Sequence, residues 1–109
     1  MAKFLPGHLV DELLLELHHW HRSGHRLERS YPTVSHREAV AFVERVASVV
    51  GDAEHEPTLD MRVEARTVHL SIHTPTHGGI TDADIDLARR IDQLPQPELR
   101  AIGPGAPLE

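Results

Sequence analysis

The residues best suited to acid and base chemistry fall just before one alternating apolar run and at the end of the next. His55 and Glu56 precede the run from Thr58 to Ala65, and His73 lies near the end of the run from Thr67 to Thr74. Alternation of this kind predicts two strands, and the short turn between them makes the strands antiparallel. Pairing of the two strands therefore brings His73 close to His55 and Glu56. Two imidazoles and a carboxylate in one cleft are suitable general acids and bases.

The rest of the chain supplies elements that must position these groups. An apolar pattern predicts a helix from about His8 to His19, and a capping box at Ser35 opens a second helix that Gly51 is placed to end. Thr81 is a weaker cap for a third helix. Alternation from Arg26 to Thr33 predicts a strand, which a turn separates from a shorter extended piece before it. The order α-β-β-α-β-β-α predicts an α+β fold, in which three helices cover one face of a four-stranded antiparallel sheet.

Composition limits the classes of protein to which the chain can belong. Its 109 residues predict a single domain over residues 1–95, followed by a Pro- and Gly-rich tail over 96–109 that we expect to be disordered. The net charge of −6 argues against direct nucleic acid binding. No apolar run approaches the ~18 residues of a membrane span. No basic segment precedes a long apolar run either, so we expect a cytoplasmic protein. Because cysteine is absent, thiol catalysis and cysteine-type zinc sites are excluded.

The segment from Glu54 to Asp84 resembles the signature of the pterin-4a-carbinolamine dehydratases. That family usually carries His-His-Pro, then Thr-His-Asp, then a Gly-Leu-Ser/Thr helix entry. Here His55 and His73 keep the spacing of the first and third histidines, whereas Glu56 replaces the second histidine. The resemblance extends over roughly residues 13–94. It implies an α+β fold of that family and removal of water from a 4a-hydroxytetrahydropterin, with neither a metal nor an organic cofactor.

The resemblance also implies roles for individual residues. In the family the histidines bind the pterin and move protons as the 4a-hydroxyl leaves, which makes His55 and His73 catalytic here, with Glu56 assisting. Substrate-binding positions around a pterin-type small molecule are occupied here by Glu54, Pro57, Ser71 and Thr74. Glu56 is the main departure, because an ionised carboxylate cannot donate a proton to a leaving hydroxyl unless its pKa is raised.

Other interpretations remain open on the sequence. The chain could be a non-catalytic or repurposed relative that acts as an oligomeric interaction or assembly module, or its pocket could serve a different substrate. A metal set could be formed by His55, Glu56, His73 and His77. No helical His-Glu-x-x-His and no Cys-x-x-Cys pattern supports that set, so we expect no metal site. A small core with leucines to spare predicts a homodimer or homotetramer.

Overall fold

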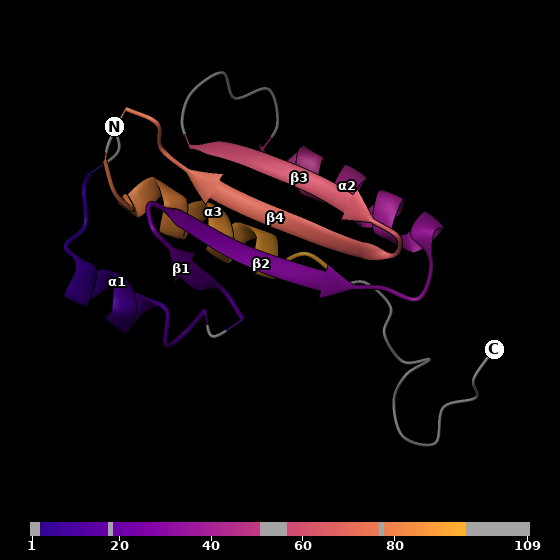
Figure 1. Cartoon of the computed structure of the whole chain (residues 1–109), viewed down its shortest axis with the longest axis horizontal. Coiled ribbons are helices and arrows are strands. Elements are labelled where there is room, and N and C mark those ends of the chain that lie inside the picture. Colours follow the sequence, from indigo (N-terminus) through magenta and orange to yellow (C-terminus); the bar gives the residue numbers. More distant parts are fainter. Residues whose placement is uncertain (1–2, 18, 51–56, 77, 96–109) are drawn as a thin grey trace.

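The computed structural model describes residues 3–17, 19–50, 57–76 and 78–95, and within them it shows three helices and four strands (Figure 1). Each element falls in the order that the sequence predicts. In chain order the elements are α1 (Gly7–Leu13), β1 (His21–Ser23), β2 (Arg26–Pro32), α2 (His36–Val50), β3 (Thr58–Glu64), β4 (Thr67–His73) and α3 (Asp82–Asp92).

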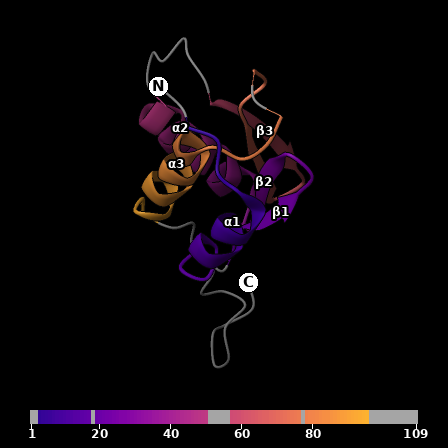
Figure 2. The ribbon, with the colours of Figure 1, turned by 90° about the vertical axis from the view of Figure 1, so that its left-hand side faces the viewer.

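The strands form one antiparallel sheet in the spatial order β1-β2-β4-β3. Figure 2 shows the helices gathered on one side of the strands, so the sheet has a covered face and an open face. The covered face carries the core, in which Leu27, Phe42, Val68 and Ile72 are fully buried. The predicted α+β architecture is therefore confirmed.

The hairpin between β3 and β4 closes in the register that the alternation predicts. Glu64 pairs with Thr67, and Ala65 in the turn adopts a left-handed φ of 56°. The carbonyl oxygen of Ala65 accepts a hydrogen bond from His36 Nδ1 at 2.7 Å, and that of Arg66 accepts one from the Thr33 hydroxyl at 2.6 Å. Contacts from the start of α2 and the end of β2 thus hold a turn that is strained for a residue with a Cβ atom.

Local capping determines where the two longer helices begin. The Glu38 backbone N–H donates to Ser35 Oγ at 3.1 Å at the start of α2. At α3 a full capping box forms, because Thr81 Oγ1 accepts from the Asp84 N–H while the Asp84 carboxylate accepts from the Thr81 N–H. These bonds satisfy backbone donors that the first turn of a helix leaves without partners.

The first helix is shorter than its sequence pattern predicts. It ends at Leu13 rather than near His19, and the next residues form tighter turns in which the Leu15 N–H donates to Glu12. Leu15 is 78% exposed, whereas Leu17 and Trp20 are buried. A helix continued beyond Leu13 would carry the chain past the sheet. The turn that ends the helix instead places the Leu17 and Trp20 side chains in the core. The expected extension was therefore wrong.

A single carboxylate joins three distant segments at the end of α3. Asp92 Oδ1 accepts hydrogen bonds from Trp20 Nε1 at 2.9 Å, Arg29 Nη1 at 2.7 Å and the Tyr31 hydroxyl at 3.2 Å. The Arg29 guanidinium also lies 3.9 Å from the centre of the Tyr31 ring. Burial raises the pKa of Tyr31, so this hydroxyl stays protonated and remains a donor. The network ties the start of the sheet to the last helix.

No helix within the described residues is long and apolar enough to cross a membrane. Residues 96–109 lie outside the described residues, so the expectation of a tail there stays a prediction.

Candidate active site

His73 is the last residue of β4, and its side chain belongs to the open face of the sheet. Along this strand Val68, Leu70 and Ile72 are buried in the core, so the residues between them point the other way. His73 is the Cα partner of Thr58, the first residue of β3. The His73 side chain is 20% exposed. An imidazole that is mostly shielded but still reachable is well suited to proton transfer with a bound molecule.

The open face is hollowed into a groove of about 380 Å³, which His73 does not line itself but which reaches its neighbour Asp60. Its walls are mainly polar and are supplied by residues of all four strands. The residues that line it are His21, Arg26, Glu28, Arg29, Ser30, Asp60, Met61, Arg62, His69, Leu70 and Ser71.

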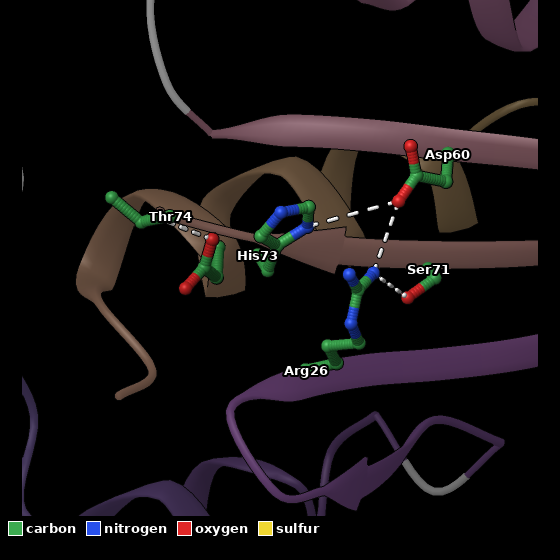
Figure 3. A network of polar contacts seen from close by, with 6 residues as sticks. Arg26, Asp60, Ser71, His73 and Thr74 are labelled. Carbon is green, nitrogen blue, oxygen red and sulfur yellow. Dashed lines mark hydrogen bonds and ion pairs between the residues drawn. The ribbon is translucent and has the colours of Figure 1, made fainter. Parts of the chain in front are cut away.

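Three side chains connect the groove to His73 (Figure 3). Arg26 Nη1 donates to Asp60 Oδ2 at 3.0 Å and to Ser71 Oγ at 2.9 Å. The same Asp60 oxygen lies 3.9 Å from His73 Nδ1. The four residues come from β2, β3 and β4, and the sheet register brings them together because Asp60 is the Cα partner of Ser71. Ser71, predicted at a substrate-binding position, thus lies in the wall of the groove.

Behind His73 the chain enters a buried hydrogen-bond network. Thr74 is 2% exposed, and its hydroxyl donates to Asp84 Oδ1 at 2.9 Å and lies 3.1 Å from Thr81 Oγ1. Burial raises the pKa of Asp84, while hydrogen bonds from Thr81 and Thr74 and the nearby His73 act in the opposite direction. Thr74 is therefore placed inside the protein, where it anchors the segment between β4 and α3.

The N-terminal segment also holds the chain that follows His73. Leu5 donates its backbone N–H to the carbonyl oxygen of Ile80 at 2.9 Å, and Phe4 pairs with Thr81 as an isolated bridge. The end of β4 and the start of α3 are thus fixed from two sides, which limits the freedom of His73.

The structure describes only some of the other predicted site residues. Pro57 is half-buried immediately before β3. Glu54, His55 and Glu56 lie outside the described residues, as does His77 of the metal alternative. Among the residues that the structure describes, no group of three His, Asp or Glu side chains is arranged to hold a metal ion.

Three residues of this site were not singled out from the sequence as functional. Arg26 and Asp60 are each consistent with the alternation of their strands, and the β3–β4 register alone would have placed Asp60 beside Ser71. Arg26 joins them only because β2 lies next to β4. Asp84 stands three residues after the predicted cap Thr81, and its buried contact with Thr74 has no signal in the sequence.

Comparison with known proteins assigns the chain to a family. The sequence model of the pterin 4 alpha carbinolamine dehydratases matches residues 5–94. The chain belongs to this family. A relative from Thermomicrobium roseum that carries the family name is 42% identical over 85 residues, which cover 78% of this chain and 89% of the relative. One from Nocardia farcinica is 43% identical over 93 residues, which cover 85% of this chain and 96% of the relative.

A solved structure supports the fold of this dehydratase family member. The crystal structure of a transcriptional coactivator/pterin dehydratase from Brucella melitensis superposes with a TM-score of 0.72 at 22% sequence identity. The match covers 83% of this chain and 96% of that chain. At this level of identity the likeness establishes the shared architecture, and the chemistry must be argued from the residues of this chain.

Proposed function

We propose that this protein removes water from a 4a-hydroxytetrahydropterin and forms the quinonoid dihydropterin. The observation that carries the proposal is the position of His73: it ends β4 on the open face, directly opposite the first residue of β3. Residues 54–57 directly precede β3 in the sequence, and they correspond to the segment in which the family has its histidine pair.

The reaction needs one group that donates a proton and one that accepts a proton. The C4a–O bond breaks as the hydroxyl takes up a proton and leaves as water, and a ring nitrogen gives up a proton to a base. His73 and His55 supply these two groups, with Glu56 assisting. Groups of this type are effective when they titrate near the working pH, as imidazole does. The reaction draws on no metal and no organic cofactor.

Substrate binding falls to residues around the same end of the sheet. Ser71 carries a hydroxyl into the groove, and Pro57 shapes the entry to β3. Glu54 completes the polar contacts to the pterin ring. Thr74 contributes from behind, because its bond to Asp84 keeps the end of β4 in place.

The Glu56→His substitution tests why this family member departs from the histidine pair. We expect dehydration to become about tenfold faster at neutral pH, because an imidazolium donates a proton more readily than a carboxyl group of ordinary pKa. The measurement is the rate of dehydration of a 4a-hydroxytetrahydropterin by purified protein. Glu64→His makes the same exchange at the far end of β3 and should leave the rate unchanged.

A different result would assign a different role to Glu56. If the wild type is the faster enzyme and Glu56→His slows it, then the carboxyl group is itself a tuned acid. If neither protein turns over the pterin and calorimetry detects no binding of a dihydropterin analogue, the dehydratase proposal is wrong and an interaction or assembly role replaces it.

We further propose that the protein is a homodimer or homotetramer. β3 is a seven-residue strand with one edge unpaired in the sheet, and an edge of this kind favours pairing with a second copy. Met61 on that strand is 37% exposed, and Val40 on α2 is 40% exposed. Light scattering at micromolar concentration should give about two or four times the chain mass of 12.2 kDa. A mass equal to one chain would contradict the proposal.

A further inference from the structure

We infer that Asp60 is a positioning residue for the dehydration, which sets the orientation and proton placement of His73 from the open face of the sheet. The inference rests on the proposed function of His73. Asp60 does not itself reach the reacting atoms, and it acts through the imidazole of His73.

The geometry holds Asp60 in one place. Its Oδ2 atom is 3.0 Å from Arg26 Nη1, and Arg26 is held in turn by Ser71 Oγ at 2.9 Å. Three neighbouring strands supply these residues, so the carboxylate is fixed by the sheet and not by its own short side chain alone. From this position Oδ2 faces His73 Nδ1 at 3.9 Å, as Figure 3 shows.

The surroundings of the His73 imidazole explain why the nearby Asp60 carboxylate can influence it. His73 Nδ1 is shielded from solvent and makes no hydrogen bond within the described part of the chain. A carboxylate facing Nδ1 favours the ring tautomer with its proton there, because the polarised N–H then points at negative charge. Nε2 of the neutral ring is then the nitrogen with a free lone pair. It can accept a proton from the substrate and, once protonated, return it.

Charged groups on each neighbouring element act on the same ring. Asp60 on β3 and Asp84 on α3 place negative charge near it, and Arg26 on β2 brings positive charge through its contact with Asp60. The Asp60 side chain is 58% exposed, and its hydrogen bond from Arg26 directs Oδ2 toward the sheet. The net effect of Asp60 is therefore moderate in size, but it is directed at one nitrogen of one histidine.

The same sheet provides a matched control. At the other end of β3, Glu64 Oε1 lies 2.9 Å from Arg62 Nη1 and 3.3 Å from His69 Nε2. This second arginine–carboxylate–histidine group has the same chemistry on the same strand pair. It is separated from His73 by the length of the hairpin, so a change there should not affect the dehydration.

The experiment compares Asp60→Asn with Glu64→Gln in the full-length protein, labelled with ¹⁵N at its histidine rings. In Asp60→Asn we expect the His73 ring to lose part of its Nδ1-protonated form, with the His69 signals unchanged. Turnover should fall roughly fivefold, because the Coulomb energy of two unit charges 3.9 Å apart in water corresponds to about that factor in rate. The change should appear in kcat more than in KM. Glu64→Gln should leave both the His73 signals and turnover as in the wild type.

A double-mutant comparison separates a role through His73 from a general structural role. In a His73→Ala background, Asp60→Asn should cause no further loss of turnover, because the group on which it acts is gone. An additional fivefold loss there would overturn the inference, as would unchanged His73 ring signals in Asp60→Asn.

The readouts also distinguish this inference from the proposed function. If the wild type does not dehydrate the pterin, the proposed function is wrong and the positioning role in catalysis falls with it, while the ring signals still decide whether Asp60 controls His73. If the wild type is active and Asp60→Asn matches it in kcat and in its His73 ring signals, the inference alone is wrong.

Discussion

Replacing His73 by alanine should lower the dehydration rate by about 10²–10⁴-fold, the usual contribution of a positioned acid or base. The expected loss is large because His73 is mostly shielded, ends β4 beside the groove and is held by the network behind it. The rate should be measured with a 4a-hydroxytetrahydropterin at saturating concentration. His8→Ala, at an exposed position on α1, removes a histidine elsewhere and should leave the rate unchanged.

Two additional measurements distinguish a catalytic role of His73 from a structural one. The free energy of unfolding of His73→Ala should stay close to that of the wild type, because the side chain lies on the open face and not in the core. Binding of a dihydropterin analogue should weaken much less than turnover falls. A loss of less than threefold in rate would contradict the catalytic role of His73.

Replacing Asp92 by alanine should lower the free energy of unfolding by roughly 2–4 kcal/mol. The substitution removes the acceptor shared by Trp20, Arg29 and Tyr31. The Arg29 and Asp92 side chains are only 13% and 25% exposed, so water replaces the lost carboxylate incompletely. A negative charge at the end of a helix is otherwise unfavourable, which indicates that these contacts outweigh the effect of the helix dipole. Urea unfolding at equal protein concentration measures the change.

Asp86→Ala is the matched control on the same helix. Asp86 pairs with Arg90 at 3.4 Å, but both side chains are more than half exposed. Exposed pairs four residues apart contribute at most a few tenths of a kcal/mol, so this variant should unfold almost as the wild type does. If Asp92→Ala is equally mild, the network at the end of α3 does little to stabilise the fold.

The placement of His73 could be predicted from the sequence for a simple reason. Alternation with a period of two and a short turn leave one register for the hairpin, because a shift by one residue would expose Val68, Leu70 and Ile72. The structure confirms that register, with Thr58 opposite His73. The helix caps at Ser35 and Thr81 are equally local, since the bonds join residues three apart.

Sequence patterns among near neighbours were insufficient where packing against distant parts of the chain opposes them. The leucine pattern after Leu13 is compatible with a longer helix, but the burial of Leu17 and Trp20 requires the chain to turn. The roles of His55 and Glu56 stay a prediction, because the residue types and spacing suggest them and the described residues begin again at Pro57.

The sequence by itself determined the order of the elements, the β3–β4 register and the face on which His73 stands, because each depends on periodicity or on contacts between near neighbours. Only the tertiary structure decided that β2 lies against β4, which brings Arg26 to Asp60 and Ser71. It also decided that Asp92 meets donors from the start of the sheet. Such contacts join residues far apart in the chain, and their pairing depends on how whole elements pack and not on any local pattern.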